Sequence, residues 1–421
     1  MFDDLLTWRE RNAMKRYACI GVVILSSLSA IVHADNWPAW RGPAGDGVAR
    51  ETHLPIEFGP EKNVTWKAPL PGEGNSVPIV WDDRVFVTCP IDGGAIRSLI
   101  GFDRETGKQL WRHDVPFPEK ETTHSDNPFC SGSPTTDGEL VYASFDSAGV
   151  FALDFDGNVV WQRDLGKLAH VFGTAITPVL YRDLLIVHRG PGEPTHIIAL
   201  NKKTGQTVWD TPEDGRNDNL WGSWSTPVFY RVGDRDEFAL SMPNVLKGYD
   251  PLTGKELWRC DGLGPSNYPD TAVGDGILIG VSGFLKSMMA VKLGGTGDIT
   301  KTHRLWHVEQ TPQRIGSGVV YNGHLYVADA PGIAHCIDVK TGDTVWKERL
   351  GGDLWGGMIR AGEHLYVGNK QGEIFVLAAS PEYQLIAKNE MGEHMKANVA
   401  PSDGQLFVRT YENLYCIGER K

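Results

Sequence analysis

Residues 337–350, IDVKTGDTVWKERL, decide the fold because their pattern recurs along the chain. A short β-branched alternation ends in a Thr-Gly break, and a second strand-forming run leads to Trp346. Gly342 supplies the positive φ that a tight hairpin needs, and Asp338 can accept hydrogen bonds from backbone N–H groups of the turn. The stretch therefore predicts two strands joined by a tight turn.

The same hairpin occurs in FDRETGKQLW, LDFDGNVVW, LNKKTGQTVW, YDPLTGKELW and the longer VKLGGTGDITKTHRLW. The turn glycine precedes the tryptophan by four residues in every copy except the last, where the separation is nine. With Ile386 at the last equivalent position, successive positions lie 40 to 50 residues apart, which is the signature of a repeat architecture. The repeated tryptophans are Trp66, Trp111, Trp161, Trp209, Trp258, Trp306 and Trp346.

Each repeat also contains three further strand candidates. A Ser-Pro or Thr-Pro segment comes first, an apolar run follows a turn, and a third run enters the hairpin. Four short strands at regular spacing are typical of one blade of a β-propeller. Because there are eight equivalent positions, we predict an all-β fold, an eight-bladed β-propeller of four-stranded antiparallel blades.

The two ends of the chain together supply one blade. The segment NVTWKAPL near the start is an outer strand without three strands before it, whereas NLYCIGERK at the end is a third strand without a fourth. We therefore expect the C-terminal strand to pair in the blade of the N-terminal strand, which removes a free sheet edge. The predicted domains are a leader with signal peptide at 1–34, an N-terminal extension at 35–61 and a single propeller at 62–421.

The start of the chain is typical of a secretory signal peptide. In MKRYACIGVVILSSLSAIVHA, residues 14–34, a basic pair precedes an apolar stretch, and the sequence ends in a small-x-small cleavage site at Ala34. Met14 or Met1 could be the start, and an uncleaved anchor is the alternative. We expect an exported protein, periplasmic or extracellular, with no transmembrane helix after signal removal.

Composition narrows the function classes. A net charge of −12 and a pI near 5.6 argue against a nucleic-acid-binding protein, which normally carries a basic patch. No two cysteines after the signal are adjacent, so neither a disulfide framework nor a zinc site is expected. We expect a monomer without bound metal.

The repeated D-x-x-T-G-x-x-x-W unit resembles the repeat of PQQ-like (pyrroloquinoline-quinone-type) β-propellers, found in quinoprotein alcohol dehydrogenases and BamB-type outer-membrane assembly proteins. The opening NWPAWRGPAGDGVA is similar to the start of exported bacterial PQQ-binding-like propeller proteins. For a dehydrogenase, the resemblance implies a quinone stacked between a tryptophan and a disulfide of adjacent cysteines, with Ca²⁺ held by Glu, Asn and Asp. This chain has no Cys-Cys pair and no C-x-x-C-H haem motif. The resemblance covers residues 37–421 and is specific for the fold rather than the activity.

The repeated residues are expected to be structural. A tryptophan used seven times at one position packs between blades, because its large ring removes much apolar surface from water. The turn carboxylates Asp103, Asp154, Asp250 and Asp338 share their position with Asn201, so a hydrogen-bond acceptor is all that the position requires. We therefore assign no catalytic residue.

Function is expected in the loops that differ between blades, where they surround one mouth of the channel. The longest is predicted at residues 112–134, and others carry tryptophans outside the repeat position. Trp221 and Trp355 could instead form a second packing ring, and His124 with Asp126 could ligate a metal. The candidate ligand-binding residues are His124, Asp126, Asn127, Trp221, Trp224, Trp355 and Lys396.

Three functions are compatible with these features. The first is a binding or protein-interaction scaffold without its own catalysis or cofactor, whose partner is a protein or small molecule at the channel mouth. The second is a quinoprotein oxidoreductase that uses PQQ and calcium on alcohols or sugars. The third is a BamB-like envelope assembly factor.

Overall fold

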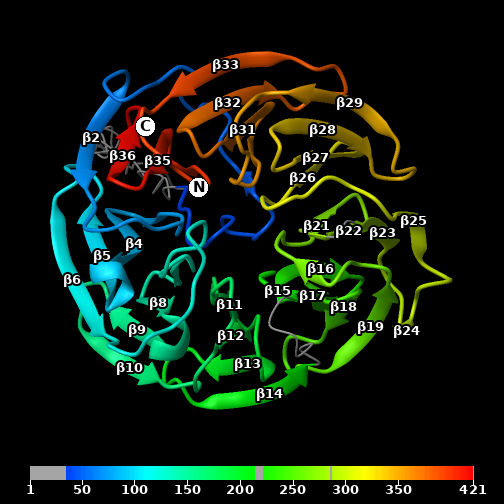
Figure 1. Cartoon of the computed structure of the whole chain (residues 1–421), viewed down its shortest axis with the longest axis horizontal. Helices are drawn as coiled ribbons and strands as arrows, with labels where there is room; N and C mark the ends of the chain where they lie inside the picture. The colour runs from blue at the N-terminus through cyan, green and yellow to red at the C-terminus, as the bar shows by residue number, and fades with distance from the viewer. Residues whose placement is uncertain (1–34, 214–220, 285–286, 421) are drawn as a thin grey trace, which may run out of the picture. The chain divides into compact units, whose positions relative to one another are not determined.

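The computed structural model describes residues 35–213, 221–284 and 287–420, so the predicted signal peptide lies outside the described residues. The described part of the chain forms eight blades of antiparallel β-sheet arranged in a ring, as Figure 1 shows. The fourth strand of each blade lies on the rim, and the first lies nearest the channel. The predicted eight-bladed β-propeller is confirmed.

The first four blades follow the chain from the first complete repeat. Blade 1 contains β3 (Ile79–Trp81), β4 (Arg84–Ile91), β5 (Ile96–Asp103) and β6 (Gln109–Pro116). Blade 2 contains β7 (Thr135–Thr136), β8 (Leu140–Ser144), β9 (Val150–Asp154) and β10 (Val159–Arg163). Blade 3 contains β11 (Val179–Tyr181), β12 (Leu184–Arg189), β13 (Thr195–Asn201) and β14 (Thr207–Glu213). Blade 4 contains β16 (Val228–Val232), β17 (Arg235–Met242), β18 (Val245–Tyr249), β19 (Glu256–Asp261) and an added β24 (Gly297–Asp298).

The last four blades complete the ring. Blade 5 contains β21 (Ala272–Gly274), β22 (Ile277–Val281), β23 (Met288–Lys292) and β25 (Arg304–Val308). Blade 6 contains β26 (Val319–Tyr321), β27 (His324–Ala328), β28 (Ile333–Asp338) and β29 (Thr344–Arg349). Blade 7 contains β30 (Ile359–Ala361), β31 (His364–Gly368), β32 (Glu373–Ala378), β33 (Leu385–Glu390) and an added β1 (Val48–Ala49). Blade 8 contains β34 (Ala400–Ser402), β35 (Gln405–Arg409), β36 (Asn413–Ile417) and β2 (Val64–Pro69).

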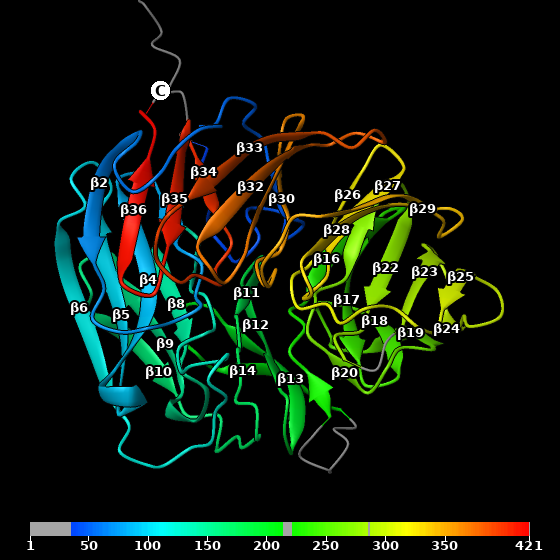
Figure 2. The same cartoon turned by 45° about the horizontal axis from the view of Figure 1, so that its top comes forward.

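Blade 8 closes the ring from both ends of the chain. Strand β2 pairs antiparallel with β36, and the two lie side by side in Figure 2. On the joined sheet, the carboxylate of Glu393 accepts hydrogen bonds from Lys67 at 2.9 Å and from the Tyr415 hydroxyl at 2.6 Å. Partial burial alone would raise the pKa of Glu393, but hydrogen bonds from Asn413, Thr410, Tyr415 and Lys67 lower it to about 2. The predicted closure is confirmed, and a charged group fastens it.

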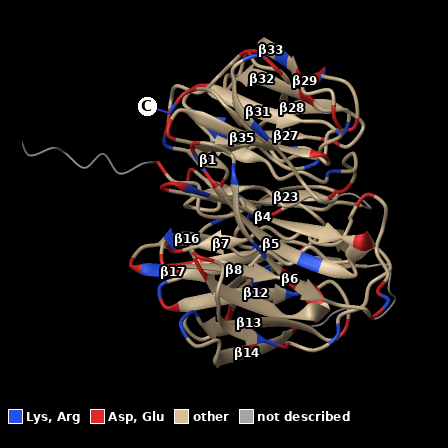
Figure 3. Ribbon diagram, turned by 90° about the vertical axis from the view of Figure 1, so that its left-hand side faces the viewer, with Lys and Arg blue, Asp and Glu red and all other residues tan. Residues whose placement is uncertain are grey.

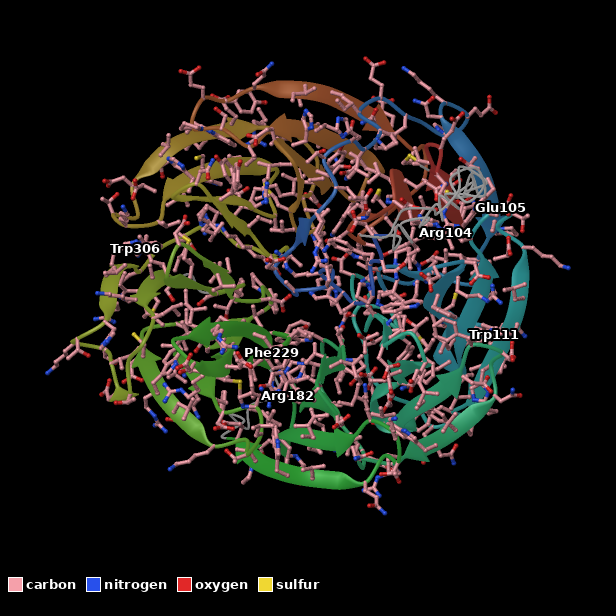
Figure 4. The ribbon with its side chains drawn as sticks, turned by 180° about the vertical axis from the view of Figure 1, so that it is seen from behind. Arg104, Glu105, Trp111, Arg182, Phe229 and Trp306 are labelled. Atoms are coloured by element: carbon pink, nitrogen blue, oxygen red, sulfur yellow. The ribbon has the colours of Figure 1, made fainter. Side chains whose placement is uncertain are left out.

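The repeated tryptophans join each blade to the next. The Trp66 indole N–H donates to the Arg104 carbonyl at 2.7 Å, and the ring lies where a Cβ on Gly107 would collide with it. Gly107 adopts φ +70°, so both its conformation and its neighbour exclude a larger side chain. Figure 4 shows Trp111 and Trp306 at the rim, where they make the corresponding contacts to blades 2 and 6. In these cases the tryptophan of one blade therefore packs directly on the turn glycine of the next blade.

Trp258 is the exception. Its indole N–H donates within its own blade, to Glu237 at 2.9 Å and the Tyr230 hydroxyl at 3.0 Å. The longer hairpin that follows it adds β24, which pairs in parallel with Trp258 and Arg259. The inserted residues thus replace the usual contact between tryptophan and turn with an extra strand.

The turn carboxylates cap their own hairpins, as predicted. Asp338 accepts hydrogen bonds from the backbone N–H groups of Lys340 at 2.8 Å and Thr341 at 3.0 Å. Asn201 accepts the equivalent pair from Lys203 and Thr204. An amide oxygen performs the same task as a carboxylate, which explains the interchange.

One predicted boundary is wrong. Residues 112–116, assigned to the long loop, continue the outer strand β6 because β5 is eight residues long and pairs as far as Ile96 with Pro116. The loop therefore begins at Phe117.

Helical structure in the described ranges is limited to two short 3₁₀ turns, η2 (Asp92–Gly94) and η3 (Asp146–Ala148). None of the helices described there has the length and apolar character needed to cross a bilayer. On the side of the ring seen in Figure 3, acidic and basic positions are interspersed along the blades, without a face of one sign.

Candidate ligand-binding cavity at the channel mouth

One mouth of the channel is hollowed into a cavity of about 880 Å³. Two kinds of loop line it: those that enter the innermost strand of each blade, and those that join the second strand to the third. Loops of the second kind contribute Phe284, Ala330 and Lys370. Every blade supplies at least one lining residue, so the cavity belongs to the ring as a whole.

The structure brings all seven predicted candidates together. His124, Asp126 and Asn127 come from blade 2, whereas the remaining four come from the loops entering blades 4, 7 and 8. Those four are Trp221, Trp224, Trp355 and Lys396. Asp126 and Lys396, which are 270 positions apart in the sequence, thus share one cavity.

Asp126 is the centre of a charged cluster. Its Oδ1 accepts hydrogen bonds from Nζ of Lys370 and Nζ of Lys396, each at 2.9 Å. The Lys396 side chain is 8% exposed and that of Lys370 is 17% exposed, so both ammonium groups are held in a partly dry environment. Partial burial alone would raise the pKa of Asp126, yet the hydrogen bonds and charges of Lys396 and Lys370 hold it below its usual range.

The same two lysines lie over the indole of Trp355. Nζ of Lys370 is 4.1 Å and Nζ of Lys396 is 5.0 Å from the ring centroid, which is within the range of cation–π attraction. Asp353 adds a second carboxylate, 3.7 Å from Lys370. The arrangement fixes the lysine side chains from two sides, with a carboxylate and an aromatic face.

Internal hydrogen bonds shape the loop of blade 2. The Asn127 side chain donates to the backbone carbonyls of Phe172 at 2.8 Å and Thr174 at 3.2 Å, which ties the loop to blade 3. The backbone N–H of Asp126 donates to Nδ1 of His124 at 3.1 Å. Asn127 therefore positions the loop, whereas His124 and Asp126 present their side chains to the cavity.

Aromatic side chains from blades 4 and 5 form another part of the wall. Trp221 stacks on Phe284, with centroids 6.4 Å apart and planes at 20°. Trp224 meets the edge of Tyr268 at 4.9 Å, and its indole N–H donates to the Gly173 carbonyl at 3.0 Å. Since both tryptophans are only half-buried, part of each ring remains open to a ligand.

The N-terminal extension forms the floor of the cavity. Trp40 lines it, and its indole N–H donates to Asp270 at 2.5 Å. The guanidinium of Arg41, 2% exposed, donates to the Gly318 carbonyl at 2.7 Å, and Trp37 forms an antiparallel bridge with Val80 in β3 of blade 1. Figure 1 shows this dark-blue segment in the middle of the ring.

Burial raises the pKa of Asp270, and the charge of Arg41 and hydrogen bonds from Thr226 and Trp40 act against that rise. The buried carboxylate thus has a cation and two donors around it. These contacts join the extension to blades 5 and 6 and support the floor.

Sequence reasoning missed Trp40, Tyr268, Phe284 and Lys370. A signal for Lys370 was present, because the turns DAPG at residues 329–332 and NKQG at residues 369–372 align and place an alanine and a lysine at the same second position. The residues at that position, Ala330 and Lys370, both line the cavity. Comparison of the second-to-third-strand turns would therefore have revealed it.

Comparison with known proteins agrees with this architecture. The family model described as outer membrane protein assembly factor BamB matches residues 59–170, 100–348 and 243–381. BamB of Yersinia pestis is 25% identical over 307 residues, covering 61% of this chain and 72% of that protein. The quinoprotein ethanol dehydrogenase of Pseudomonas putida is 26% identical over 280 residues, covering 58% of this chain and 42% of the enzyme. The chain thus spans less than half of that dehydrogenase.

Solved structures show the same fold. BamB from Moraxella catarrhalis superposes with a TM-score of 0.62 at 14% identity, covering 84% of this chain and 99% of that one. Quinohemoprotein alcohol dehydrogenase from Comamonas testosteroni superposes with a TM-score of 0.69 at 12% identity, covering 92% of this chain and 81% of that one. The repeats, the closed ring and the matched residues establish that the chain belongs to the PQQ-like repeat β-propeller family, whose model is described as outer membrane protein assembly factor BamB.

Proposed function

We propose that this protein is an exported binding protein without its own catalysis, which takes its ligand in the cavity at the channel mouth. The observation that carries the proposal is the convergence of open aromatic rings and a fixed charged cluster on one cavity closed below by the N-terminal extension. Concave sites with aromatic walls and a few oriented polar groups are the usual form of small-ligand sites. The seven predicted candidates are its proposed ligand-contacting and positioning residues.

Export and domain organisation are parts of the same proposal. The sequence of residues 14–34 supports a signal peptide, and we propose a periplasmic or extracellular location for the propeller. We propose that residues 35–61 belong functionally with the propeller, since their contacts build the cavity floor.

A ligand-binding test uses a variant that fills the cavity. Ala330→Trp adds an indole at a lining position, whereas Val208→Trp adds the same group on an outer strand where the side chain is 52% exposed. Thermal-shift screening of a mixed library of sugars, peptides and aromatic acids should give compounds that stabilise the unaltered protein and Val208→Trp but not Ala330→Trp. Equal stabilisation of all three, or no stabilising compound, would contradict the proposal.

A quinoprotein activity is the second candidate suggested by the dehydrogenase relatives, and the side chains do not fit it. Among the residues that the structure describes, no three His, Cys, Asp or Glu side chains gather as a metal ion would require. The five described cysteines are buried and unpaired, so none forms a disulfide beside the cavity. Among the described residues, the cavity therefore has neither such a cluster nor the disulfide of adjacent cysteines that the resemblance implies.

An assembly role is the third candidate, and the matched family model and the names of several relatives favour it. It predicts that a defined envelope protein binds the propeller at a surface that includes the cavity mouth. Cross-linking from a photoreactive amino acid at Asp353, which lines the mouth and has a side chain 56% exposed, should then capture one reproducible partner. The same group at Val208 serves as the control, and equal capture from both positions would contradict this role.

A further inference from the structure

We propose that the ligand of this cavity is an uncharged oligosaccharide, an inference that rests on the binding function proposed above. Its basis is the combination of aromatic faces, a charge-balanced polar cluster and a volume of about 880 Å³. That volume lies near the upper end of the range of about 300–1,000 Å³ for small-ligand sites, which leaves room for more than one sugar ring.

The aromatic wall matches the apolar side of a sugar ring. A pyranose presents C–H groups on one face and hydroxyl groups around its edge, so it needs a flat apolar surface with polar groups beside it. Trp221 is backed by Phe284, and Trp224 is fixed by its N–H bond to Gly173, so both rings are held in place before a ligand arrives. Preformed rings lower the entropic cost of binding.

The exposed polar cluster of the cavity is balanced in charge, while the third lining carboxylate, Asp270, lies on the floor under the influence of the Arg41 charge. Two ammonium groups, Lys370 and Lys396, face two carboxylates, Asp126 and Asp353. A ligand carboxylate or phosphate would meet both of those acids, and a ligand cation would meet both lysines. An uncharged ligand meets neither repulsion.

The cluster retains hydrogen-bonding capacity suited to hydroxyl groups. An ammonium has three donors, and a carboxylate accepts up to about four hydrogen bonds. Lys370 and Lys396 both direct a donor to the same oxygen of Asp126, which leaves acceptor capacity on that carboxylate and donor capacity on the lysines. A hydroxyl group both donates and accepts hydrogen bonds. The hydroxyl groups along one sugar edge can therefore donate to Asp126 and accept from Lys370 and Lys396.

Titration calorimetry with cellotetraose, maltotetraose and xylotetraose, and with tetragalacturonate as an acidic counterpart, tests the inference. At least one neutral sugar should bind saturably and more tightly than tetragalacturonate. Its affinity should change less than about twofold between about 0.1 and 1 M salt, over which the Debye length falls from about 10 Å to about 3 Å. Tighter binding of tetragalacturonate, or binding of none of the sugars, would overturn the inference.

Variants locate the binding. Trp221→Ala should weaken the affinity by about tenfold or more, as expected for a central aromatic contact, and Lys396→Met should weaken it comparably because donors to the hydroxyl groups are lost. Leu252→Ala, at an outer turn where the side chain is 51% exposed, should leave it unchanged. Equal affinity of all variants would overturn the assignment to this cavity.

Two outcomes separate this inference from the function on which it rests. If library compounds bind in a manner blocked by Ala330→Trp and no sugar does, the saccharide assignment is wrong and the binding function stands. If sugars bind the Ala330→Trp protein as tightly as the unaltered one, neither the binding function nor the saccharide assignment holds for this cavity.

Discussion

The tryptophans on the rim and those at the channel mouth use the same side chain for different purposes. On the rim, Trp66 is buried and its N–H bonds to the next blade, so both the ring and its polar atom are satisfied inside the protein. At the mouth, Trp221 and Trp355 are half-buried, with part of each ring facing an 880 Å³ cavity. Tryptophans at the repeated position stabilise the ring of blades, whereas Trp221 and Trp355, outside that position, have ring surface available to a ligand.

The largest effect on stability is expected on the rim. Trp258→Ala removes a side chain that is 3% exposed and a donor to the buried carboxylate of Glu237. The expected loss in the free energy of unfolding is about 4 kcal/mol, measured by urea denaturation. Trp258→Phe restores most of the volume without the N–H and should recover part of the loss. A loss below about 1 kcal/mol for Trp258→Ala would refute the structural role of the rim position.

The second-largest loss of stability is expected from substitutions in the floor of the cavity. Arg41→Met removes the buried guanidinium that donates to the Gly318 carbonyl at 2.7 Å and whose charge acts against the raised pKa of Asp270, at an expected cost of about 2 kcal/mol. Arg50→Met removes an exposed arginine nine positions later and should cost less than about 0.5 kcal/mol. Equal midpoints of thermal unfolding for the two variants would show that the extension does not depend on this contact.

The closure of the ring should give a defined acid dependence. The folded-state pKa of Glu393 is lowered to about 2 from an ordinary 4.5, so its stabilisation is fully present above pH 4.5 and is lost as the pH falls toward 2. Because solvent screens this partly exposed site, the contribution at neutral pH is on the order of 1 kcal/mol. Glu393→Gln should lower stability at pH 7 and flatten the pH dependence between these values in urea titrations. An unchanged pH profile would contradict the role of this carboxylate.

The smallest effect is expected at the hairpin turns. Asp338→Asn keeps the acceptor for the two backbone N–H groups and should change stability by less than about 0.5 kcal/mol, as Asn201 at the same position suggests. Asp338→Ala removes the acceptor and should cost about 1 kcal/mol. If the Asn variant lost as much as the Ala variant, the negative charge would matter at this position.

The sequence allowed the blade number, the closure and the place of the cavity to be predicted, because the repeat is local and its exceptions stand out. Trp221 lies outside the repeated tryptophan position, and Trp355 and Lys396 lie in loops between blades. The role of the extension was not predicted, since Arg41 reaches a carbonyl 277 residues away and no local pattern encodes such a contact. The hydrogen bonds that repeated tryptophans other than Trp258 donate to the next blade were missed for the same reason.

The most direct test of the division between rim and mouth is to measure unfolding and ligand affinity on the same three proteins. These are the unaltered chain, Trp258→Ala and Trp221→Ala, with a ligand that Ala330→Trp excludes. Trp221→Ala should lose about tenfold or more in affinity while its free energy of unfolding changes by less than about 1 kcal/mol, and Trp258→Ala should lose about 4 kcal/mol of stability and keep its affinity while folded. The opposite pattern, a Trp221→Ala protein that is strongly destabilised yet binds normally, would contradict the account.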